Sequence, residues 1–162
     1  MKTLSLYVAA LLGLAQGVFL DPSIHLLMST SHTDSPLSAT VDVQVVYVGV
    51  NPATNEIAFE YFPDRITAQP GSMVQFQFHA AAHTLTQSNF DNPSIPIANH
   101  QTDTGAPLPP GIFSGAMDVA AAKAQGFLPT FTVLINDTKP IWLYCTTGPH
   151  CSKGMNMVIN EK

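Results

Sequence analysis

Short stretches in which apolar and polar residues alternate recur along the chain after position 40. The clearest runs from 72 to 79 and gives one face Phe76 and Phe78, together with either Met73 or Val74. A period of two is typical of a strand with one buried face. Weaker patterns, rich in β-branched and aromatic residues, predict further strands at 40–48, 57–62, 65–68, 130–135, 141–145 and 155–159.

The stretch from 91 to 129 is irregular, because proline, glycine and small residues dominate it. Within it, residues 118–125 predict one short helix that begins near Asp118 and ends at Gly126. Many short strands separated by turn signals, with almost no helix, indicate an all-β fold, an antiparallel sandwich or barrel.

The first residues predict a targeting signal. A positive start is followed by an apolar run at 4–14 and by small residues at 15–17, so we expect a secretory signal peptide over 1–17. The apolar run is too short to span a membrane. Residues 18–38 lack a sustained period and predict an extended N-terminal segment, followed by one domain at 39–162. The C-terminus carries no hydrophobic tail, so we expect no lipid anchor there.

Composition narrows the class of protein. The chain has 162 residues, enough for one domain, and its 46% hydrophobic content suffices for a core. Only 10% of the residues are charged and the net charge is -5, which argues against a nucleic-acid partner.

The segment between the last two predicted strands carries the candidate chemistry. Four residues separate Cys145 from His150, and four separate His150 from Met155. A loop of this length can bring a thiolate, an imidazole and a thioether to one point. Two histidines, a cysteine and a weak axial methionine form the arrangement of blue copper sites, so one further histidine would complete the set.

His83 is the best candidate for that histidine, because it follows the most secure strand and a strand end can aim a ligand at the rim of a sandwich. His79 competes with it, but the alternation places His79 opposite the Phe76 and Phe78 face, which favours a surface role.

The alternative for the two cysteines is a disulfide between Cys145 and Cys151, which cysteine count alone favours in a secreted protein. That bond would pull Cys145 away from a metal. The spacing of cysteine, histidine and methionine, together with a strand-end histidine, favours copper.

The chain resembles the cupredoxins, within them the phytocyanin and plantacyanin branch, and most of all the small secreted cupredoxin-like proteins of fungi. The similarity lies in Phe59 to Phe76, in His83-Thr84-Leu85-Thr86-Gln87-Ser88-x-Phe90, and in Ile141-Trp142-x-Tyr144-Cys145-x-x-x-x-His150-Cys151-x-x-Gly154-Met155. The resemblance implies a Greek-key fold and one type 1 copper held by His83, Cys145, His150 and Met155.

The chain departs from the phytocyanin pattern at one place. That pattern has a cysteine soon after the first ligand, which pairs with the cysteine that follows the second histidine. Here Ser94 stands at that place, so Cys151 lacks the partner that the resemblance implies. Thr84 and Thr146 each follow a ligand directly, and such positions can fix a copper site through hydrogen bonds.

These features predict a secreted one-electron transfer protein with no enzymatic activity, a monomer with an unidentified extracellular redox partner and no membrane span. It would lie outside the cell, either free or attached to the cell wall. Two alternatives remain: an extracellular protein that holds or delivers copper, and a structural cell-surface module. Asn136-Asp137-Thr138 is an N-glycosylation sequon in a predicted turn, which predicts a glycoprotein.

Overall fold

A computed structural model describes residues 40–162 of the chain. The predicted signal peptide at 1–17 and the predicted extended segment at 18–38 lie outside these residues, as does position 39. The domain boundaries therefore stay predictions.

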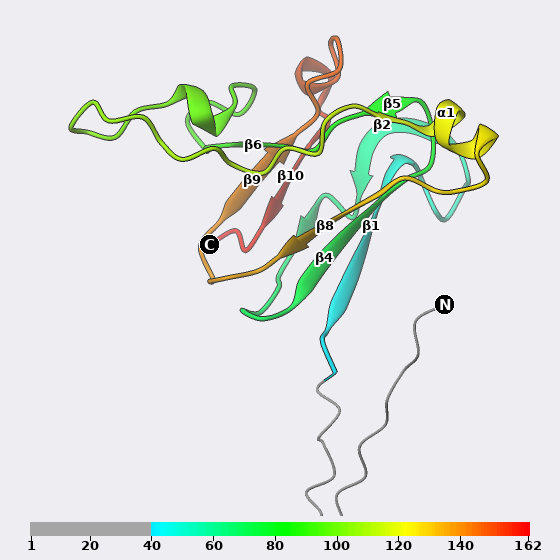
Figure 1. Cartoon of the computed structure of the whole chain (residues 1–162), viewed down its shortest axis with the longest axis horizontal. Coiled ribbons are helices and arrows are strands. Elements are labelled where there is room, and N and C mark those ends of the chain that lie inside the picture. Colours follow the sequence, from blue (N-terminus) through cyan, green and yellow to red (C-terminus); the bar gives the residue numbers. More distant parts are fainter. Residues whose placement is uncertain (1–39) are drawn as a thin grey trace, which may run out of the picture. The chain divides into compact units, whose positions relative to one another are not determined.

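Two four-stranded sheets form the framework (Figure 1). The first has the order β2 (Ile57–Phe62), β1 (Val43–Val50), β4 (Met73–Phe78) and β8 (Thr130–Leu134). The second has the order β3 (Arg65–Ile66), β10 (Asn156–Ile159), β9 (Ile141–Tyr144) and β6 (Thr86–Ser88). A short pair, β5 (Ala82–His83) and β7 (Met117–Asp118), stands apart from both. The all-β sandwich expected from the sequence is thus confirmed.

The expectation of a purely antiparallel arrangement is wrong for two strand pairs. β1 runs parallel to β4, and β3 runs parallel to β10. The reason lies in the connection between β1 and β4, in which β2 pairs with β1 but β3 joins the other sheet. The chain crosses between the sheets before it returns to the first one, and it can therefore re-enter beside β1 in the same direction.

The core lies between the two sheets. From β4, Val74, Phe76 and Phe78 are fully buried, which settles that Val74 and not Met73 shares the inward face. They pack in one cluster with residues of the opposite sheet, among them Leu143 and Ile159. This cluster is what a sandwich requires, because each sheet has one apolar face to remove from water.

The predicted helix is confirmed as α1 (Val119–Ala124). The Asp118 carboxylate accepts hydrogen bonds from the N–H groups of Ala120 and Ala121 at 2.9 and 3.1 Å, which explains why the helix begins there. Two short 3-10 turns occur as well, η1 (Ile97–Asn99) and η2 (Cys151–Lys153). Within residues 40–162, no helix is both long and apolar enough to cross a membrane.

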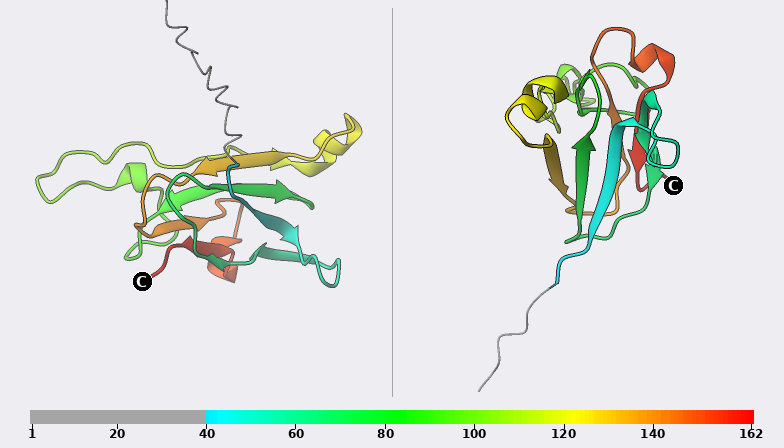
Figure 2. Two further views of the ribbon diagram at one scale, coloured as in Figure 1. Left: turned by 90° about the horizontal axis from the view of Figure 1, so that it is seen from below. Right: turned by 90° about the vertical axis from the view of Figure 1, so that its right-hand side faces the viewer.

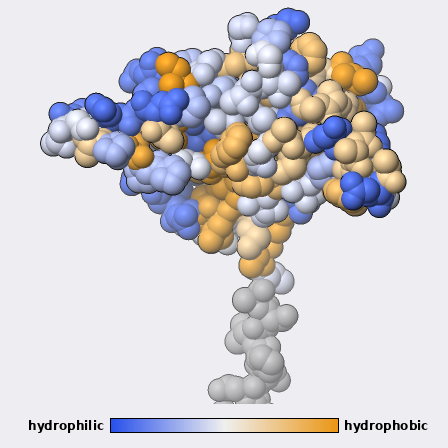
Figure 3. Space-filling model, turned by 45° about the horizontal axis from the view of Figure 1, so that its top comes forward, coloured by the Kyte–Doolittle hydropathy of each residue, from blue (hydrophilic) through white to orange (hydrophobic). Residues whose placement is uncertain are grey.

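The elements that carry the candidate ligands meet at one end of the sandwich. The loop between β9 and β10 lies at the same end as α1 (Figure 2, right) and close to β5 (Figure 1). On the face drawn in Figure 3, groups of hydrophobic residues are interrupted by hydrophilic ones.

Candidate metal centre

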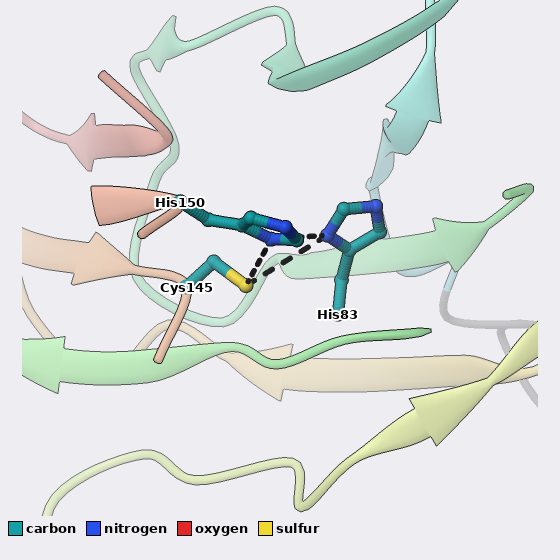
Figure 4. A group of neighbouring side chains, drawn as sticks. All are labelled: His83, Cys145 and His150. Atoms are coloured by element: carbon teal, nitrogen blue, oxygen red, sulfur yellow. Dashed lines mark hydrogen bonds between the residues drawn. The ribbon is translucent and has the colours of Figure 1, made fainter. Parts of the chain in front are cut away.

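Three candidate ligands converge on one point. His83 ends β5, Cys145 directly follows β9, and His150 directly precedes η2. Figure 4 shows the two imidazole rings and the thiol pointing toward one another. His83 Nδ1 lies 3.2 Å from His150 Nδ1, and Cys145 Sγ lies 3.7 Å from the first nitrogen and 3.4 Å from the second.

The triangle of donor atoms has the size that a transition-metal ion requires. A point equidistant from the three atoms lies about 2 Å from each, which is close to the length of a bond between such a metal and imidazole. His83 and Cys145 are fully buried and His150 is 8% exposed, so the point is shielded from water. A thiol with two imidazoles is a donor set that suits copper, and the three residues therefore fit type 1 copper.

Thr84 fixes the sulfur of Cys145. Its N–H donates to Cys145 Sγ at 3.4 Å, and its hydroxyl lies 3.9 Å from the same atom. The hydroxyl oxygen in turn accepts the N–H of Thr146 at 2.8 Å. The two threonines proposed from sequence to support the site therefore lie in one network with the thiol.

The surroundings favour the ligand forms of the side chains. Burial by itself would raise the pKa of the Cys145 thiol, but hydrogen bonds from Thr147, Thr84 and His150 outweigh it and the pKa is lowered. Burial lowers the pKa of His83, so its ring stays neutral and keeps a lone pair. A thiolate and a neutral imidazole are the forms that bind metal.

The backbone of the ligand loop sets the position of the fourth predicted ligand, Met155. Met155 N–H donates to the carbonyl of His150 at 2.9 Å, and the carbonyl of Met155 accepts the N–H of Cys145 at 3.1 Å. The Met155 side chain is fully buried in the same core cluster as Cys145. The loop thus holds the Met155 backbone against Cys145 and His150, and the copper-ligand role of all four residues stays a prediction.

His79 lies elsewhere. It does not belong to the donor cluster found within residues 40–162, and its ring stacks on Tyr47 with centroids 4.9 Å apart. Of the two histidines weighed from sequence, His83 is the one that the fold turns toward Cys145.

Two residues at the site were missed from sequence. Phe59 of β2 stacks on the His150 ring at 4.3 Å between centroids. Gly49 of β1 lies against the other histidine, since a Cβ built on it would stand 2.7 Å from His83 Nε2. A lone glycine inside a strand pattern can mark such a close approach, and this was the available signal for Gly49.

Cys151 contacts the residue that replaces its expected partner. Both cysteines are free, and the Ser94 hydroxyl lies directly against Cys151 Sγ. The chain therefore brings 94 and 151 together as in a bridged protein, but with a hydroxyl where the second sulfur would be.

We expect the substitution Ser94→Cys to form a disulfide with Cys151 and to stabilise the protein by about 3 kcal/mol, because the bond would close a long loop in the unfolded chain. Denaturant unfolding of the metal-free variant, with and without a reductant, measures the gain. Thiol alkylation should find one free cysteine in the oxidised variant and two in the original protein. An unfolding midpoint that does not respond to the reductant would contradict the expected bond.

Comparisons with known proteins give two sequence relatives, both from Arthroderma benhamiae. The chain is 35% identical over 122 residues to an extracellular serine-rich protein, a match to 75% of this chain and 39% of the relative. It is 32% identical over 100 residues to a probable GPI-anchored cupredoxin, a match to 62% of this chain and 44% of the relative. The chain thus spans less than half the length of these relatives, and no family model matches it.

Solved structures similar to the chain include auracyanin B, with a TM-score of 0.46 and 14% identity over 73% of this chain and 86% of that one. Another is a plastocyanin from Dryopteris crassirhizoma, with a TM-score of 0.41 and 22% identity over 73% of this chain and 99% of that one. Since both TM-scores are low, the fold rests on the sheets and register described above. The chain is cupredoxin-like in that it is similar in sequence to two fungal proteins, one of them named as a cupredoxin, and combines a β-sandwich with a cluster of two histidines and one cysteine.

Proposed function

We propose that the protein is a secreted one-electron carrier that holds a single type 1 copper through His83, Cys145, His150 and Met155. The observation that carries the proposal is the convergence of two buried imidazoles and one buried thiol within 4.8 Å of one another. Copper bound there would supply a couple between Cu(I) and Cu(II), for which thiolate and imidazole are suitable donors.

The protein can keep this donor set nearly fixed, as an electron carrier requires. Thr84 holds the sulfur through its N–H, and the backbone bonds between Met155, His150 and Cys145 hold the loop. Burial keeps solvent from replacing these contacts. A site that changes its geometry little between two oxidation states has little to reorganise when an electron moves.

A redox partner would make contact at the side of the site where His150 lies, and two observations support this. His150 is the one of the three donors that reaches the surface, and the half-exposed Phe59 covers its ring. Lys153 Nζ lies 5.2 Å from the centre of the Phe59 ring. The partner itself is unidentified.

Location outside the cell is supported by the predicted signal peptide and by relatives named as extracellular and GPI-anchored. Asn136 lies exposed in the turn between β8 and β9, where a glycan could be attached. We propose no enzymatic activity, because an oxidase that reduces oxygen needs several coppers and the residues from 40 to 162 contain one donor cluster of this kind.

Copper addition followed by voltammetry tests the proposal. The protein should take up one copper, become intensely coloured and give a reversible one-electron wave. Release of copper on reduction would contradict electron transfer while leaving copper binding intact.

Copper holding is the second candidate, favoured by the free thiol of Cys151. Cys145 and Cys151 line one surface pocket of about 240 Å³, so a second soft donor lies near the site. A holding protein that used Cys151 should lose affinity for Cu(I) in the variant Cys151→Ser. An electron carrier with the four proposed ligands should keep it.

We expect Met155→Leu to keep both copper and colour but to raise the reduction potential, since the oxidised ion loses a donor. The reduction potential should rise by about 60 mV for each tenfold increase in the affinity for Cu(I) relative to that for Cu(II). Voltammetry measures it, with Met157→Leu, a buried methionine two positions away, as the matched control. Equal reduction potentials in the two variants would show that Met155 is not a copper ligand.

A further inference from the structure

A second cavity lies beside the metal centre. Its volume is about 380 Å³, within the range of small-molecule sites. It is bounded by β6, by the irregular segment that follows β6, and by Thr146. In Figure 1 this segment makes a long excursion past β6, away from α1.

Hydrogen bonds hold in place the wall of the cavity that is formed by the segment around Ile112. Gln87 N–H donates to the carbonyl of Ile112 at 2.8 Å, and Gln87 Oε1 accepts the N–H of Ile112 at 3.0 Å. Next to them, Ser114 N–H donates to the Leu85 carbonyl and Ser114 Oγ accepts the Leu85 N–H. The wall is therefore fixed to the sandwich by bonds within the protein.

The lining specifies the chemistry of an occupant. Ile97, Ile112 and the 61% exposed Phe113 give apolar surface, and none of the described residues that line the cavity is charged. A neutral ligand is therefore favoured, because an ion would lose its water without gaining a partner. Gln87 adds one hydrogen-bond donor to the lining. Its Oε1 already accepts the N–H of Ile112, whereas its Nε2 hydrogens have no hydrogen bond within residues 40–162.

The cavity is connected to the thiol of the metal centre. Thr146, which lines it, follows Cys145 directly and donates its N–H to Thr84 Oγ1 at 2.8 Å. Thr84 in turn donates its N–H to Cys145 Sγ at 3.4 Å. A molecule in the cavity would therefore lie two hydrogen bonds away from the sulfur.

We propose that this cavity binds a small neutral aromatic molecule that carries one hydrogen-bond acceptor, such as a phenol. The aromatic ring would lie against Ile97 and Phe113, and the acceptor oxygen would take a hydrogen bond from Gln87 Nε2. The site goes beyond the proposed electron transfer and does not depend on it, because none of its lining residues is a proposed copper ligand.

Calorimetric titration of the full mature protein with 4-ethylphenol tests the site, with and without copper. For a ligand of this size in a half-open apolar cavity, we expect a dissociation constant of roughly 0.1 to 1 mM. Amide resonances of Gln87, Ile112 and Thr146 should shift in the metal-free protein. Ethylbenzene, which lacks the hydroxyl, and 4-hydroxybenzoate, which is an anion, should each bind more weakly.

Ala98→Trp is the blocking variant, since Ala98 is an exposed residue of the lining and an indole there would fill the cavity. Ala124→Trp places the same side chain on an exposed alanine at the end of α1 and is the matched control. We expect the first to weaken phenol binding by about tenfold or more and the second to leave it unchanged.

Three results would overturn the proposal. The first is no saturable binding of 4-ethylphenol up to about 5 mM, a concentration well above the expected dissociation constant. The others are equal binding by Ala98→Trp and Ala124→Trp, and binding of 4-hydroxybenzoate as tight as that of 4-ethylphenol. Failure of copper to colour the protein would refute the proposed function and leave this site standing.

Discussion

Cys145→Ser is expected to abolish the intense colour of the copper-loaded protein and most of its affinity for Cu(I). The thiolate is the strongest donor of the set, and its charge transfer to copper gives the colour. The serine hydroxyl can still accept the N–H of Thr84, so the fold should remain, at a cost of about 1 kcal/mol in the free energy of unfolding. Visible absorption, a Cu(I) competition titration and denaturant unfolding give the three quantities.

Cys151→Ser is the matched control for this experiment. It makes the same chemical change in the same loop, at a thiol that lies outside the donor cluster and contacts Ser94. Its copper-loaded form should keep the colour of the original protein. Retained colour in Cys145→Ser, or lost colour in Cys151→Ser, would show that the sulfur has been assigned to the wrong cysteine.

The convergence of the donors could be predicted because loop spacing and strand ends are visible in sequence. Cys145 and His150 stand in one short loop, and His83 follows the strand with the clearest alternation. The contacts that support them were harder to foresee. Phe59 reaches His150 only because β2, far away in sequence, is carried to the same end of the sandwich.

The fold likewise divides into features that local sequence patterns predict and features that they do not. β4, with its sustained period, and β2, with its β-branched and aromatic residues, were predicted almost to the residue, and the cap at Asp118 predicted the start of α1. β5, β6 and β7 were missed because two or three residues are too few to show a period. The parallel pairing of β1 with β4 was missed because it depends on a crossing between sheets that no local pattern records.

Gly49→Ala is the second substitution with a large expected effect, because the added methyl group would press against the ring of His83, a proposed copper ligand. An added Cβ would stand 2.7 Å from His83 Nε2 and 2.9 Å from its Cδ2, well inside normal contact distance. His83 is fully buried and its strand pairs with β7, so the ring has little room to move. Gly49 also has a φ of +85°, which an alanine adopts with strain.

We expect Gly49→Ala to lower the free energy of unfolding by about 2 to 4 kcal/mol, as overpacking adds to backbone strain. Displacement of the His83 ring should weaken copper binding by roughly 10- to 100-fold, the effect seen when a ligand's supporting contacts are disturbed. Denaturant unfolding of the metal-free protein and a copper competition titration measure the two losses separately.

Gly71→Ala is the control that separates the effect of the steric clash in Gly49→Ala from the effect of backbone strain. Gly71 has nearly the same φ, +88°, but a Cβ built there meets nothing within 4 Å. The control should therefore lose only the strain energy, about 1 kcal/mol, and bind copper as the original protein does. If both variants lose equal stability and both keep full copper affinity, the close approach of Gly49 to His83 has no role in holding the ligand. If only Gly49→Ala loses copper, the glycine is part of what positions the site.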